Sequence, residues 1–110
     1  MTYVKSYKFD KELQELALIA KVLSHPARLA ILQYLAKSKT CISGDISNEI
    51  PLSRTTVSQH LQELKKAGLI QGEIDGVKIN YCICNKTLAI CKDLFESFFN
   101  ETINNVNHEC

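Results

Sequence analysis

The sequence predicts a mainly α-helical domain that carries a two-stranded β-hairpin. The chain has 110 residues, of which 45% are hydrophobic and 23% charged, as expected for one globular domain. Apolar residues recur at helical spacing along most of it, and the spacing changes to alternation only around residues 69–83. We therefore expect one domain over residues 1–110, with its core in 10–103 and a frayed tail at 104–110.

Two helices are expected at the amino-terminal end. From Leu13, apolar residues follow i, i+3, i+4 and i+7, and further ones widen the stripe, which predicts a helix covered on more than one side. His25-Pro26 interrupts it, because the residue before proline is displaced from the helical region while proline suits a first turn. The second helix is expected from about Pro26 to Ala36. Its inward residues are Leu29, Ile31, Leu32 and Leu35.

A short extended piece at Cys41-Ile42 and a pair of closely joined helices are expected next. Ser43 can cap a short helix over Gly44 to Ile50. Ser53 can cap a helix from Arg54 to Ala67, which a left-handed Gly68 closes. The buried stripe of this helix is Val57, Leu61 and Leu64. Two helices about three residues apart form a helix-turn-helix.

Alternating apolar residues then predict a β-hairpin. Leu69 to Ile74 is the first strand, Asp75-Gly76 a two-residue type I′ turn, and Val77 to Ile83 the second strand. Asn85 can cap a last helix. Its apolar residues are Leu88, Cys91, Leu94, Phe95, Phe98, Phe99 and Ile103. Helices, helix-turn-helix, hairpin and closing helix, in this order, make a winged helix-turn-helix.

The charge balance excludes a polycationic coat for nucleic acid. The chain has 13 basic and 12 acidic side chains, a net charge of +1. Residues 85–110 hold 2 Lys/Arg against 4 Asp/Glu, so this end is not expected to face phosphate. No apolar run approaches the roughly 18 residues of a membrane span, and the start lacks a signal-peptide core. We expect a cytoplasmic protein with no membrane partner.

Two motifs match one family of regulators. The first is His25-Pro26-Ala27-Arg28 followed by Ile31, Leu32 and Leu35, and the second is the run LSRTTVSQHLQELKKAGLI over residues 52–70. Over about residues 11–103 the chain resembles the ArsR-type bacterial repressors. The resemblance implies a homodimeric repressor that binds an inverted-repeat operator in double-stranded DNA, with its first and last helices forming the dimer interface.

A helix of this kind enters the major groove by its amino-terminal half. We expect DNA contacts from Ser53, Arg54, Thr55, Ser58, Gln59, Gln62, Lys65, Lys66 and, in the hairpin, Lys78. Arg54 suits guanine and Gln59 suits adenine. The alternative is that these are solvated polar residues of an amphipathic helix. His60 is interpreted as a packing residue or a phosphate contact, and Arg28 as a salt-bridge or helix-capping residue.

The apolar stripes of the terminal helices exceed what one small core needs. A chain of this size gains from docking such stripes on a second subunit. The predicted dimer interface consists of Leu13, Leu16, Ala20, Leu94, Phe95 and Phe98.

The five cysteines form no disulfide framework, so reduced thiols are expected. The ArsR-type cysteine pair has no full counterpart, because Cys41 falls one place early and lacks a second cysteine. Cys82 and Cys84 share a strand face, and Cys91 follows on the next helix. These three are a candidate site for arsenite or another soft metal ion, or a pair of them responds to oxidants. Alternatively, Cys91 is a core residue and the strand cysteines have no role.

Two other function classes compete with a repressor. An enzyme is not expected, because none of His25, His60 and His108 forms an acid–base motif with a cysteine. A winged-helix module that binds only proteins would carry apolar or acidic residues on the exposed face of the 54–66 helix. That face instead carries Arg, Thr, Ser, Gln and Lys.

Overall fold

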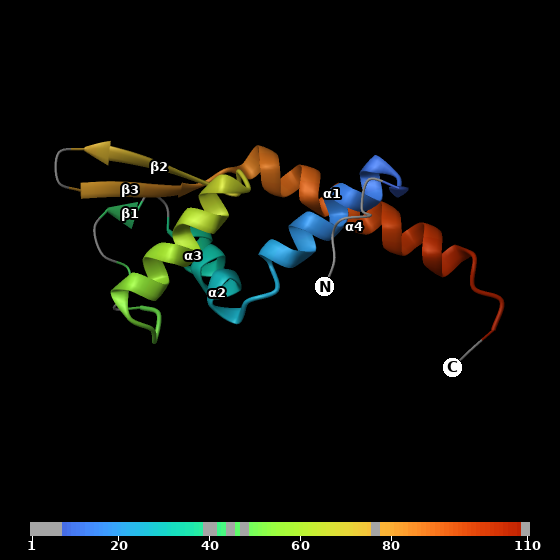
Figure 1. Ribbon diagram of the computed structural model, residues 1–110, viewed down its shortest axis with the longest axis horizontal. Coiled ribbons are helices and arrows are strands. Elements are labelled where there is room, and N and C mark those ends of the chain that lie inside the picture. The colour runs from blue at the N-terminus through green and yellow to red at the C-terminus, as the bar shows by residue number, and fades with distance from the viewer. Residues whose placement is uncertain (1–7, 39–41, 44–45, 47–48, 76–77, 109–110) are drawn as a thin grey trace.

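The computed structural model describes residues 8–38, 42–43, 46, 49–75 and 78–108. Its elements are α1 (Lys11–Val22), α2 (Pro26–Lys37), β1 (Ile42–Ser43), α3 (Arg54–Lys66), β2 (Ile70–Asp75), β3 (Lys78–Ile83) and α4 (Asn85–Asn104), as Figure 1 shows. The strands form an antiparallel sheet in the order β1-β3-β2. The predicted winged helix-turn-helix is confirmed, and β1 adds an edge strand to the hairpin.

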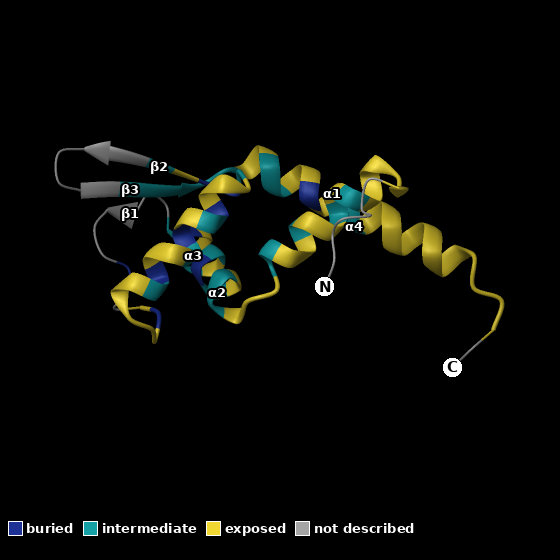
Figure 2. Cartoon of the chain, viewed as in Figure 1, coloured by how far each residue is buried: buried dark blue, intermediate teal, exposed yellow. Residues whose placement is uncertain are grey.

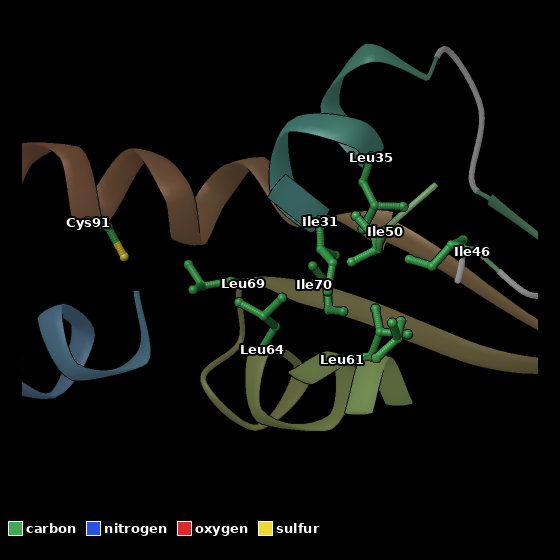
Figure 3. Packing of buried hydrophobic residues seen from close by; sticks show 10 residues of the cluster. Ile31, Leu35, Ile46, Ile50, Leu61, Leu64, Leu69, Ile70 and Cys91 are labelled. Carbon is green, nitrogen blue, oxygen red and sulfur yellow. The ribbon is translucent and has the colours of Figure 1, made fainter. Parts of the chain in front are cut away.

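The molecule divides into a head, residues 26–83, and an arm made of α1 and α4. In the head, α2 and α3 pack against each other and against the sheet (Figure 1). Its buried residues are Ile31, Leu35, Ile46, Ile50, Val57, Leu61, Leu64, Leu69 and Ile70, most of them labelled in Figure 3. The described head therefore has a contiguous apolar core.

Local signals fix both ends of α3. The Ser53 hydroxyl accepts a hydrogen bond from the backbone N–H of Thr56 at 3.2 Å, so the predicted N-cap is confirmed. At the other end Gly68 has φ +80°, which only glycine adopts at little cost. The N–H of Gly68 reaches the carbonyl of Lys65, and that of Leu69 reaches Leu64, a Schellman closure. Helix α3 is thus held at a defined length.

The arm contrasts with the head, because it has little core of its own. Helix α1 has no buried residue and α4 has only Cys91. Large apolar side chains lie exposed on both helices: Leu13, Leu18, Ile90, Phe98, Phe99 and Ile103. Figure 2 shows the arm mostly as exposed ribbon. The cover predicted for α1 on more than one side is therefore absent within the described single chain.

The arm also makes the molecule long. The Cα radius of gyration is 16.6 Å and the extents are 55 × 32 × 25 Å. A compact domain of this length has a radius of gyration of about 13 Å. The excess arises because α1 and α4 pack on each other beyond the head (Figure 1).

Three predicted details need correction, and a fourth lies largely outside the described residues. Leu29, expected inside, is 47% exposed, because it lies outside the Ile31 and Leu35 face of α2. The turn was expected at Asp75-Gly76, but Asp75 pairs with Lys78 in the sheet, which moves the loop on by one residue. Residues 76–77 themselves lie outside the described part.

The third correction concerns the start of α4, and the untested detail concerns the short helix before α3. Asn85 does not cap α4, because Asn85 is already helical and Cys84 holds the extended N-cap position, with its carbonyl accepting from the N–H of Leu88. The short helix expected over residues 44–50 falls largely outside the described residues. In this segment the N–H of Glu49 donates to the carbonyl of Ile46 at 3.0 Å, a hydrogen bond between residues three apart, as in a single turn.

Candidate nucleic-acid interface

Helix α3 presents a polar face to solvent. Eight of the predicted DNA contacts are exposed: Ser53, Arg54, Thr55, Ser58, Gln59, Gln62, Lys65 and Lys66. At 100° per residue, the seven of them on the helix fall within an arc of roughly 140°. The buried Val57, Leu61 and Leu64 face the head core. The structure thus brings the predicted contacts together on one side of one helix.

The charges on this face favour an anionic partner. Helix α3 has no acidic residue in its first turn, and Lys65 and Lys66 stand in its last. Lys66 also binds Glu63 at 3.3 Å, an exposed i,i+3 pair that contributes little to stability. Free N–H groups at the start of a helix add partial positive charge. The ninth predicted contact, Lys78, starts β3, and its side chain lies outside the described part.

On the opposite flank of α3, His60 contacts the start of α2. Arg28 donates from Nε to Nδ1 of His60 at 3.0 Å and from Nη1 to the carbonyl of Val22 at 3.1 Å. The rings of His25 and His60 lie 5.4 Å apart. Burial first, and then Arg28 and His25, lower the pKa of His60 below its ordinary value. The bond to Val22 agrees with the predicted capping role of Arg28.

The predicted soft-ion cysteines lie in three different environments. Cys82 on β3 is disulfide-bonded, to a sulfur outside the described residues. Cys84 is a free, partly exposed thiol whose sulfur lies 3.3 Å from the Thr87 hydroxyl, and hydrogen bonds from Thr87 are the main cause of its lowered pKa. Cys91 is free and buried, and burial raises its pKa. In the described part of the chain no three metal-ligating side chains gather.

The disulfide corrects the expectation that all thiols are reduced. The sequence shows the hairpin, but it does not show that β1 returns to pair with β3, with Ile42 opposite Tyr81. That pairing brings a second segment beside the strand that holds Cys82. Cys41 and Cys110 lie outside the described residues.

Between α1 and α4 runs a groove of about 960 Å³. Four predicted interface residues line it: Leu13, Leu16, Leu94 and Phe98. Of the other two, Ala20 is exposed and Phe95 half-buried. The sequence prediction omitted Leu18, Ile90, Phe99 and Ile103, which are also exposed on the arm. The signal for Leu18 was the widened apolar stripe of the first helix, and for Phe99 and Ile103 it was their place beside the stripe of the last helix.

A winged helix-turn-helix whose second helix, here α3, presents a polar face to solvent is typical of the DNA-binding transcriptional regulators. A family model described as a helix-turn-helix domain matches residues 23–73. Over 75 residues the chain is 35% identical to the HTH-type transcriptional regulator YgaV of Escherichia coli (strain K12), covering 68% of this chain and 76% of that protein.

Solved structures agree. An ArsR-like transcriptional regulator from Rhodococcus sp. RHA1 matches with a TM-score of 0.68 and 26% identity, over 84% of this chain and 86% of that one. A possible ArsR-family regulator from Mycobacterium bovis, described as a homodimeric winged helix-turn-helix DNA-binding domain, matches with a TM-score of 0.61 and 25% identity, over 100% and 97%. The chain belongs to the ArsR-type family of winged helix-turn-helix transcriptional regulators. No helix in the described residues is long and apolar enough to cross a membrane.

Proposed function

We propose that the protein is a homodimeric repressor that acts in the cytoplasm by binding an inverted repeat of double-stranded DNA near a promoter. The exposed polar arc of α3 carries this proposal. It offers a guanidinium at Arg54, an amide at Gln59 and a hydroxyl at Ser58, which suit base edges and phosphates in a major groove. A dimer on this DNA blocks polymerase from the promoter.

The arm supports the dimer. Two chains that dock their α1/α4 grooves cover Leu13 and Phe98, which are 42% and 39% exposed in the single chain. A symmetric dimer sets its two recognition helices one helical turn of DNA apart, about 34 Å. The homodimer described for the Mycobacterium bovis relative is consistent with this arrangement.

The competing function classes find less support. A module that binds only proteins needs an apolar or acidic docking face, and the exposed face of α3 is polar and basic. A thiol enzyme needs a base beside its nucleophile. The free thiol of Cys84 is instead hydrogen-bonded to Thr87 and Gln71, neither of which is a base.

For the inducer, thiol oxidation fits better than a three-thiolate ion site. Cys82 is already disulfide-bonded and Cys91 is buried in the core, so neither offers an accessible thiolate beside Cys84. We propose that a peroxide oxidises the Cys82 thiol to a sulfenic acid with release of water. A second thiol then forms the disulfide and releases a second water, and a cellular thiol reverses the bond.

The partner sulfur can be identified directly. Because Ile42 lies opposite Tyr81 in the ladder, the register predicts that position 41 faces Cys82, so we expect a Cys41–Cys82 bond. Peptide mass mapping without reductant tests this expectation. A bond from Cys82 to Cys110 would contradict it.

The experiment that tests the function is DNA selection with the purified protein, repeated with dithiothreitol, hydrogen peroxide, arsenite and zinc. We expect enrichment of an inverted repeat, with binding that changes on oxidation and is unaffected by the ions. Cys82→Ser should abolish the response to peroxide, with Cys91→Ser as the matched control. If arsenite releases the protein from DNA, and this release requires Cys82, Cys84 and Cys91 together, the three cysteines form a soft-ion site and the oxidation proposal is wrong.

A further inference from the structure

Arg28, at the start of α2, joins three helices. One arm of its guanidinium caps the carbonyl of Val22, the last residue of α1, at 3.1 Å. Its Nε donates to His60 on α3 at 3.0 Å. A guanidinium is a planar, rigid fork, so two such bonds fix the relative position of both acceptors. Arg28 therefore links the arm to the helix that carries the predicted DNA contacts.

The bond to His60 requires one particular form of the imidazole. Nδ1 can accept only while it bears no proton, so the ring must be neutral with its hydrogen on Nε2. Burial, the neighbouring guanidinium and the His25 ring, 5.4 Å away, all disfavour a charged imidazole. The contact thus fixes both the orientation and the tautomer of His60.

His60 is well placed to control the rotation of α3. At 100° per residue, it lies on the far side of the buried stripe from Arg54. Apolar contacts of Val57, Leu61 and Leu64 hold the helix against the core but are not directional. A hydrogen bond is directional, and this one starts from a residue that also holds the end of α1.

We propose that Arg28 is a positioning residue that sets the orientation of α3 relative to α1, and thereby the placement of both recognition helices in the dimer, without itself touching DNA. This role rests on the proposed function. Arg28 and His60 then affect DNA affinity indirectly, through the orientation of α3, although neither belongs to the exposed polar face of that helix. The competing explanation is that Arg28 binds a phosphate.

Affinity and its salt dependence separate the two explanations. Arg28→Ala and His60→Leu should each weaken binding to the selected DNA by about tenfold or more, because each breaks a charge-assisted bond. The slope of log affinity against log salt should not change. His60→Asn keeps an acceptor near Nδ1 and should retain most of the affinity. Arg28→Lys can reach only one of the two acceptors and should fall between.

Lys65→Ala is the control, because it also removes one positive charge, from an exposed side chain of α3 that suits a phosphate contact. It should lower the magnitude of the salt slope by about 1, as the loss of one phosphate contact does. If Arg28→Ala lowers the slope equally, Arg28 binds phosphate and the positioning role is overturned.

A second readout needs no DNA. In the parent protein at neutral pH, nitrogen NMR should show an unprotonated Nδ1 and a protonated Nε2 at His60. Arg28→Ala should mix the tautomers and raise the pKa of His60, while thermal unfolding shows that the variant is folded. Unchanged nitrogen signals in a protein that binds DNA overturn the role of Arg28 alone. A parent protein that selects no DNA overturns the proposed function as well.

Discussion

The head and the arm solve the same problem of apolar burial in different ways. Within the described residues, the head holds all of the buried apolar side chains except Cys91. The arm consists of α1, which is as long as α2, and the longer α4, yet it leaves Phe99 and Ile103 more than half exposed. The head buries its apolar side chains within one chain, whereas the arm leaves several of its own exposed. Association through the arm, as proposed above, would couple dimer formation to the placement of the head.

The largest expected effect comes from the head core. Leu64 is 0% exposed, so Leu64→Ala should lower the free energy of unfolding by about 2–5 kcal/mol. Leu13→Ala in the arm should act through association, so its effect on stability should be absent at protein concentrations below the dimer dissociation constant and should appear as the concentration rises. Denaturant unfolding at several protein concentrations measures both. A concentration-independent loss in both variants would remove the distinction between the two regions.

The next largest effect is expected from a substitution that disrupts the arm and leaves the head unchanged. Phe98→Asp places a charge in the α1/α4 groove, and an aromatic residue at the centre of an interface contributes about 2 kcal/mol or more. We expect sedimentation to show a dimer for the parent at micromolar concentration and a monomer for the variant. The far-UV spectrum reports whether the head stays folded. A monomeric parent would contradict the prediction.

A smaller effect tests the exposed face of α3. Gln59→Ala should weaken specific DNA binding by about 1–3 kcal/mol. Arg54→Ala should weaken it as well, whereas Lys92→Ala, which removes the same charge from α4, should not. Binding titrations with the selected DNA measure all three. Equal affinities for Arg54→Ala, Ser58→Ala and Gln59→Ala would rule out α3 as the reading helix.

The same contrast explains what the sequence could predict. The head elements were predictable because their signals are local: Ser53 caps, Gly68 closes, and Val57, Leu61 and Leu64 repeat at helical spacing. Tertiary contacts were not. An extended piece was predicted at Cys41-Ile42, where β1 lies, but nothing near it indicates pairing with β3, so neither its place in the sheet nor the disulfide of Cys82 was predicted. The Arg28–His60 bond spans 32 residues, a separation at which periodicity gives no signal.

The smallest expected effect is on the pH dependence of stability. The pKa of His60 is lowered in the folded chain from an unfolded value of 6.5. As pH falls below about 6.5, the imidazole of the unfolded state takes up a proton before that of the folded state, so the free energy of unfolding falls. Above that pH the imidazole is neutral in both states, and His60 causes no loss of stability. Unfolding at pH 7.5 and 5.5 should therefore show a larger loss for the parent than for His60→Asn. Equal losses would show that His60 titrates normally.

The central claim is that the exposed arm is a dimer interface that places two copies of α3 on one DNA. The most direct measurement is the stoichiometry and half-site spacing on DNA selected by the parent protein, from sedimentation and footprinting. The account predicts two chains per duplex and an inverted repeat whose half-sites lie about 10 base pairs apart, centre to centre. One chain bound to a single, unrepeated site would contradict it.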